Sequence, residues 1–92
     1  MATELYIEHL DMLPEDGRGR IQRYIEEGYG LSMSAFYRCV IAGDFENARQ
    51  QADAENAAAI PAYEEYLAKY APVACCGSYE NLSAWRGLGA SA

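Results

Sequence analysis

Residues 33–44 read MSAFYRCVIAGD and give the clearest helical signal in the chain. Their apolar side chains are spaced i, i+3, i+4, i+7 and i+8, which places them along one face of an α-helix. These side chains are Met33, Phe36, Tyr37, Val40 and Ile41. Ser32 or Ser34 is the expected N-cap, and Gly43 is expected to end the helix.

Upstream of this stretch, the sequence predicts another helix that ends at Gly28. Pro14 suits its first position, and the acidic residues that follow Pro14 complement the positive end of the helix dipole. Its apolar stripe consists of Ile21, Tyr24 and Ile25. Residues 5–13 have no clean apolar period, so we expect an irregular arm, or a short helical turn, that lies on the core.

Downstream, the pattern predicts three further helices. Asp44 is the expected N-cap of a third helix whose inner face runs from Phe45 to Ala59. We expect Pro61 to begin a fourth helix, because proline cannot continue a helix without a kink. Tyr63, Tyr66, Leu67 and Tyr70 form its inner face, with Glu65 placed to pair with Lys69. Ser78 caps a last short helix over residues 79–86, followed by a loose tail over residues 87–92.

Two-residue alternation of apolar and polar side chains, which would indicate a strand, is absent from the sequence. Ninety-two residues suffice for one domain with its own core. The sequence therefore predicts a single all-α domain, a bundle of four or five short helices over residues 1–92. We expect its core to include Tyr24, Ile25, Phe36, Val40, Leu67 and Trp85.

The charge balance is strongly acidic, with 14 Asp and Glu residues against 7 Lys and Arg residues and a net charge of −7. Nucleic acids and anionic membranes attract basic proteins, so the composition argues against either as a direct partner. A protein partner, or a protein–RNA complex, with a basic surface fits this charge. Solubility alone also accounts for it.

Nothing in the sequence indicates catalysis, a metal or a cofactor. The three cysteines are Cys39 and the adjacent pair Cys75 and Cys76, a poor framework for disulfides or for zinc, which is usually bound by spaced pairs. His9 is the single histidine and lies in the segment with the least regular pattern, with only carboxylates close to it in sequence. We therefore expect a binding protein and not an enzyme. The first residues lack the features of a signal peptide, and we expect a cytoplasmic protein of the host cell.

Several short motifs carry a resemblance to a known group. The longer motifs are residues 23–28 (RYIEEG), 34–36 (SAF) and 43–45 (GDF). Single residues and pairs add to these: Val40, Ala52-Asp53, Asn56, Ala71-Pro72, Cys75, Gly77-Ser78 and Trp85. Together they span most of residues 13–86 and resemble a group of small accessory proteins of tailed bacteriophages and prophages. The chain departs from that pattern at Met33, where the group tends to have Pro-Gly before the serine, and at Cys76, where it tends to have an aromatic residue. The resemblance implies a phage origin and a possible anti-defence role, such as that of anti-CRISPR proteins, and implies no chemistry.

The acidic residues are the candidate contacts. Glu26 and Glu27 lie at the carboxyl end of a predicted helix, where a negative charge opposes the helix dipole and gains nothing locally. Glu46 and Asp53 are expected to share the outer face of the third helix, and Glu64 lies on the fourth. Carboxylates at helical spacing can imitate the phosphates of a duplex and occupy a basic groove. The leading hypothesis is an anti-CRISPR inhibitor that docks these five residues on a CRISPR effector complex.

Two alternatives stay open. The rival hypothesis is a phage structural or regulatory interaction protein that self-associates through a tyrosine-rich surface. Asn56, on the apolar face of the third helix, is either a contact residue or an amide that bonds a helix end inside the bundle.

Overall fold

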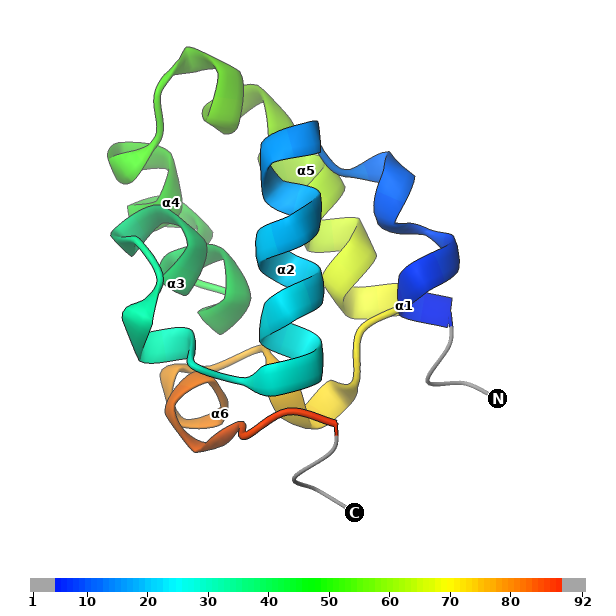
Figure 1. Ribbon diagram of the computed structural model, residues 1–92. Helices are drawn as coiled ribbons and strands as arrows, with labels where there is room; N and C mark the ends of the chain where they lie inside the picture. The colour runs from blue at the N-terminus through cyan, green and yellow to red at the C-terminus, as the bar shows by residue number, and fades with distance from the viewer. Residues whose placement is uncertain (1–4, 89–92) are drawn as a thin grey trace.

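The computed structural model describes residues 5–88, and its regular elements are all helical. Figure 1 shows α2 at the front with α5 behind it, α3 and α4 on one side, α1 on the other and α6 beneath them. The elements are α1 (Leu5–Glu8), η2 (Leu10–Met12), α2 (Glu15–Glu27), η3 (Gly30–Ser32), α3 (Ala35–Ala42), α4 (Phe45–Gln51), α5 (Ala54–Lys69), η4 (Val73–Cys75) and α6 (Tyr79–Ala84), where η marks a 3-10 helix. The predicted all-α bundle is confirmed.

Helix α3 follows the quoted sequence closely. It begins after Ser34, although the serine side chain makes no capping hydrogen bond, and it ends at Gly43, whose φ of 79° is in the left-handed region. The amide of Gly43 donates to the carbonyl of Val40, and the next amide donates to Cys39, which satisfies carbonyls at the helix end. Phe36 and Val40 are buried as predicted, whereas Met33 lies before the helix and is half-buried.

The helix boundaries between residues 44 and 70 differ from those predicted. The expected third helix is interrupted at Ala52 and Asp53, and a new helix, α5, begins there and continues through Pro61. The Asp53 carboxylate accepts the amide of Asn56 at 2.8 Å, which restarts the helix by local capping. Pro61 removes one hydrogen bond from the interior of α5 but lies on its exposed side, and the alanines around it favour helix strongly.

The first end of the described chain takes the helical one of its two expected forms, and the start of the expected loose tail is held by a hydrogen bond. Residues 5–13 form the short helical turns α1 and η2, and not an irregular arm; Tyr6, Leu10 and Leu13 are buried. At the other end, the amide of Leu88 donates to the carbonyl of Ile25 at 3.1 Å, so the expected tail begins in contact with α2. Residues 89–92 of that tail lie outside the described residues.

Tyrosine is a core residue in this protein. Tyr24, Tyr63 and Tyr66 are almost completely buried, between α2 and α5. The hydroxyl of Tyr24 donates to the carbonyl of Cys75 at 2.6 Å, and that of Tyr66 donates to the carbonyl of Tyr6 at 2.7 Å. Burial raises the pKa of both hydroxyls well above the ordinary value. All six predicted core residues are buried, and no helix within residues 5–88 is long and apolar enough to cross a membrane.

Candidate binding surface

The five predicted contact carboxylates do not converge on one site. Glu26 and Glu27 lie at the end of α2 that adjoins α6, whereas Asp53 lies at the connection between α4 and α5, at the far end of the molecule in Figure 1. Glu46 is in the first turn of α4 and Glu64 is on α5. Because Asp53 begins a different helix, the predicted shared outer face with Glu46 is wrong.

Glu26 has a structural role that the sequence did not indicate. Its carboxylate is half-buried and accepts hydrogen bonds from the Tyr6 hydroxyl at 2.8 Å and from the Gln22 amide at 3.1 Å. These bonds tie α1 to α2 and offset the unfavourable position of Glu26 in the helix dipole. Glu26 is therefore a poor candidate for a contact residue. Asp53 is also a poor candidate, because its carboxylate caps α5.

Glu27, Glu46 and Glu64 are exposed, and nothing in the fold requires their charge. Within the described chain there are two ion pairs. Both are exposed, and each joins two residues of the same helix. Arg23 lies 3.8 Å from Glu27, and Lys69 lies 3.4 Å from Glu65 as predicted. Such pairs contribute little to stability. The negative charge of α4 and α5 at Glu46, Asp53, Glu55 and Glu64 has no ion-pair partner in residues 5–88.

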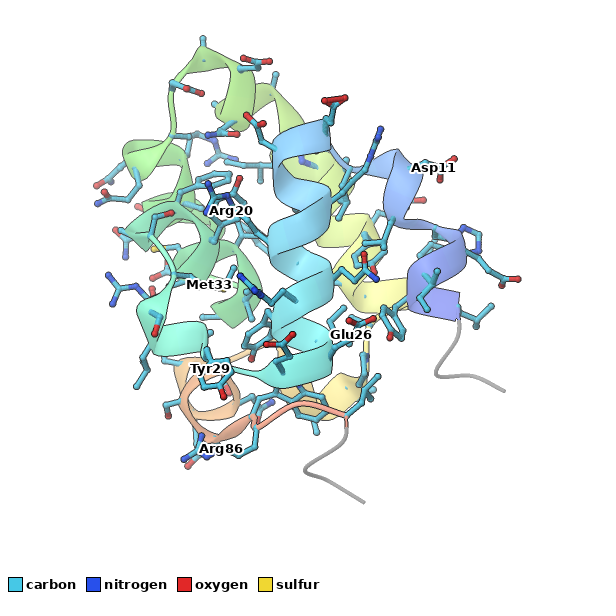
Figure 2. The ribbon with its side chains drawn as sticks, in the orientation of Figure 1. Asp11, Arg20, Glu26, Tyr29, Met33 and Arg86 are labelled. Atoms are coloured by element: carbon cyan, nitrogen blue, oxygen red, sulfur yellow. The ribbon has the colours of Figure 1, made fainter. Side chains whose placement is uncertain are left out.

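A short apolar ridge on η3 is the feature that sequence reasoning missed. Tyr29 and Leu31 expose 70% and 64% of their surfaces. Tyr29 has a φ of 63° and a ψ of 33°, and it is the single non-glycine residue with positive φ in the described chain. A bulky residue in this region carries a conformational cost that the surrounding structure must offset. Figure 2 shows Tyr29 at the surface, above α6 and close to Arg86.

The backbone beneath the ridge is held by contacts that are distant in sequence. The indole nitrogen of Trp85 donates to the carbonyls of Tyr24 and Ile25, each at 3.1 Å, and so satisfies the end of α2. Gly28, with a φ of 91°, passes so close to Arg86 that a Cβ atom would lie 2.9 Å from its carbonyl carbon. Only glycine permits this approach, which explains why the ridge is flanked by glycine.

Hollows lie on both sides of the ridge. An open groove of about 920 Å³ separates α2 from η3, and its charged lining is mixed: Glu15, Asp16, Arg20, Arg23 and Glu27. The smaller hollow, of about 540 Å³, lies between η3 and α6 and is lined by Leu31, Leu82 and Trp85 among others. Glu27 and Arg86 are the charged residues that line this second hollow.

A polar cluster joins α6 to the start of α4. The Tyr79 hydroxyl donates to the Asp44 carboxylate at 2.6 Å, and the Asn47 side chain donates to it at 2.7 Å. The bond from Tyr79, followed by those from Asn47, holds the pKa of Asp44 below its ordinary value. The same bond raises the pKa of Tyr79. Asp44 caps α4 as predicted, so this cluster serves the fold.

The polar residues first considered for chemistry occupy structural positions. His9 stacks on Tyr70, with 3.7 Å between ring centroids and 8° between planes. Cys39 and Cys75 are buried and Cys76 is half-buried, all as free thiols; a hydrogen bond with Cys76 and burial raise the pKa of Cys75. No group of three or more His, Cys, Asp or Glu side chains in residues 5–88 is placed to hold a metal ion.

The side-chain amide that bonds a loop carbonyl is that of Asn81, and no such bond is found for Asn56 within residues 5–88. The side chain of Asn81 donates to the carbonyl of Cys76 at 2.8 Å, while its backbone amide donates to the Ser78 hydroxyl at 3.0 Å. Asn56 is half-buried in the first turn of α5, where its backbone amide donates to Asp53. The Ser78 cap was predicted, and it brings Asn81 within reach of the turn that precedes it.

The surface tyrosines number fewer than the self-association hypothesis required. Of the eight tyrosines, Tyr6, Tyr24, Tyr37, Tyr63 and Tyr66 are buried and Tyr70 is half-buried. Tyr29 and Tyr79 are the exposed ones, and Tyr79 is bonded to Asp44. The expected tyrosine-rich surface is therefore absent from residues 5–88. Among them, Tyr29 is the exposed tyrosine whose hydroxyl makes no hydrogen bond.

The described chain presents a surface with two separate parts of different character. One part is the unpaired carboxylates of α4 and α5, and the other is the ridge of η3 with its hollows. Comparison with known proteins adds no family: no family model matches the chain, and neither a curated protein nor a solved structure shows significant similarity to it.

Proposed function

We propose that this chain is a phage-encoded anti-defence protein that acts by binding and has no catalytic activity. Its partner would be a bacterial complex with a basic nucleic-acid-binding surface, such as a CRISPR effector complex. The observation that carries the proposal is the exposed negative charge of Glu46 on α4 and of Glu55 and Glu64 on α5, which has no ion-pair partner in the described chain.

Charge of this kind is used in recognition at a distance. Carboxylates that are not neutralised within the chain add to the field around the protein and attract a basic partner before contact. The side chains of Glu46 and Glu64 are exposed and make no hydrogen bond within residues 5–88, so their charge is available to a partner. The five predicted contacts reduce to Glu46 and Glu64, because Glu26 and Asp53 are bonded within the fold and Glu27 is paired with Arg23 on α2.

The proposal is tested by measuring target-DNA binding by several purified CRISPR effector complexes, with and without this chain. We expect at least one complex to lose DNA binding, and the inhibition to weaken as salt is raised, because screening reduces attraction through solvent. Glu46→Gln/Glu64→Gln, which keeps size and removes charge, should inhibit more weakly than the parent. If no complex is inhibited at low salt, the proposal fails.

A second candidate function is that of a phage structural or regulatory interaction protein. One observation favours it: Tyr29 and Leu31 are exposed, and the positive φ of Tyr29 costs conformational free energy. A partner that contacts Tyr29 would explain why the fold keeps this costly conformation. Glu46→Gln/Glu64→Gln should leave such a function unchanged, which separates the two candidates.

A further inference from the structure

We infer that two copies of this chain associate about a two-fold axis through the surface formed by Glu27, Tyr29, Leu31, Leu82, Trp85 and Arg86, here called the η3 surface. This inference goes beyond the proposed function and does not depend on it, because it concerns contacts between two copies of the chain. It rests on complementarity of shape, charge and rigidity, all within this one surface.

The shape of the η3 surface is self-complementary. Tyr29 and Leu31 project from it, and beside them lies the hollow of about 540 Å³, which buried Leu82 and Trp85 help to line. In a two-fold interface, the same patch of each copy contacts the other, so a projection must sit beside the hollow that receives its equivalent. The apolar ridge of each copy can thus enter the apolar hollow of the other.

The charges of the η3 surface are self-complementary as well. One acidic residue, Glu27, and one basic residue, Arg86, line the hollow, so the surface has no net charge although the chain has a net charge of −7. A two-fold axis places Glu27 of each copy near Arg86 of the other, which gives two pairs across the interface. Contact through α5 would instead bring Glu64 and Glu65 of two copies together, which repels.

The η3 surface is also held rigidly before any contact is made. The Trp85 indole bonds to the end of α2, and the close approach of Gly28 to Arg86 positions the start of the ridge. An exposed aromatic side chain on a rigid backbone loses little conformational entropy when it is buried by a partner. Aromatic and arginine residues are the types that most often dominate such contacts.

The test is sedimentation equilibrium of the parent and of variants over a wide range of protein concentration. We expect a concentration-dependent dimer for the parent. Tyr29→Gly, which removes the ring and suits the left-handed backbone, should raise the dissociation constant about tenfold or more while leaving the thermal midpoint near that of the parent.

Charge exchange identifies the interface. Glu27→Arg and Arg86→Glu should each weaken the dimer, and the double variant should restore it, because the pairs across the axis are then reversed in sign. If repulsion between the two acidic copies controlled association, Glu27→Arg would instead strengthen the dimer, because that change makes the chain less acidic. Glu64→Gln is the matched control on α5 and should not weaken the dimer.

Three results would overturn the inference. The first is a monomer at every concentration, and the second is a dimer that Tyr29→Gly leaves intact. The third is a double variant that stays as weak as the single ones while its thermal midpoint matches the parent's. Because none of these measurements includes a defence complex, they leave the proposed function to be decided by its own assay.

Discussion

The two ends of the molecule are stabilised by different kinds of interaction. At the end where α2 meets η3 and α6, the contacts join residues about sixty positions apart, such as the bonds from Trp85 to Tyr24 and Ile25. At the end where α4 meets α5, the chain is held by the bond from Asn56 to Asp53, three residues apart. The first end presents an apolar ridge and the second presents acidic side chains.

The difference shows what each kind of surface requires. An exposed aromatic residue with positive φ needs a rigid support, because its conformational cost must be offset by contacts elsewhere. Exposed carboxylates need only a helix to carry them, and a local cap suffices to start one. Changes to the buried support of the first end should therefore affect the whole fold, and changes at the second end should have smaller, local effects.

The largest effect is expected from Trp85→Ala. This change removes a buried indole together with its hydrogen bonds to the carbonyls of Tyr24 and Ile25, which then keep only the backbone amides of Gly28 and Leu88 as donors. We expect the free energy of unfolding to fall by about 3–5 kcal/mol, most of the stability of a domain this small. Denaturant unfolding followed by circular dichroism measures it.

Trp85→Phe separates packing from hydrogen bonding at the same position. An aromatic ring is largely retained and the indole donor is lost while both carbonyls keep a backbone donor, so the expected cost is about 0.5–1.5 kcal/mol. If Trp85→Ala proves as mild as this, the junction of α2 and α6 is not the stabilising end, and the comparison of the two ends is wrong.

A smaller effect is expected at the other end from Asp53→Ala. Loss of the cap leaves the first amides of α5 without an acceptor, at a cost of about 0.5–2 kcal/mol. Asp53→Asn, which can still accept the bond, should cost less. Hydrogen exchange should show the loss confined to the first turn of α5, and a loss of protection throughout the core would contradict the local role assigned to this cap.

The smallest effect expected is the loss of stability at low pH that comes from the hydrogen bond between Asp44 and Tyr79. The pKa of Asp44 is lowered in the folded state, so its contribution to stability is present above the unfolded pKa, about 4, and is lost as the pH falls through the folded value. Tyr79→Phe removes the main cause, and the pKa of Asp44 should rise toward its ordinary value. An NMR titration of the Asp44 carboxyl measures this, and an unchanged pKa would show that the bond from Tyr79 is not its cause.

Helix positions and the core were predictable because they depend on local spacing. The apolar stripe of residues 33–41 predicted α3, and Ser78 predicted the start of α6, where its hydroxyl accepts the amide of Asn81. The boundary between α4 and α5 was not predicted, because Pro61 is the stronger breaker in sequence. Asp53 determines that boundary through a single hydrogen bond, and Pro61 is tolerated on the exposed side of α5.

The candidate surface was predicted only in part. Exposed acidic side chains follow from composition, but the bonds that occupy Glu26 come from Tyr6, twenty residues away, and no sequence spacing reveals them. The η3 ridge was missed because Gly28-Tyr29-Gly30 reads as an ordinary turn. The available signal was the pair of glycines that flank an aromatic residue. Glycine is needed there because the backbone closely approaches α6 and the residues after it, which lie more than fifty positions away in the sequence.

We propose that the unpaired carboxylates of α4 and α5 bind the basic surface of a defence complex, and that the η3 end has a separate role. One experiment compares Glu46→Lys/Glu64→Lys with Glu27→Arg as inhibitors of target-DNA binding by a complex that the parent inhibits. We predict that the double reversal weakens inhibition about tenfold or more, equivalent to about 1.4 kcal/mol, and that Glu27→Arg changes it little. Inhibition that survives the double reversal, or that is lost with Glu27→Arg alone, would contradict the claim.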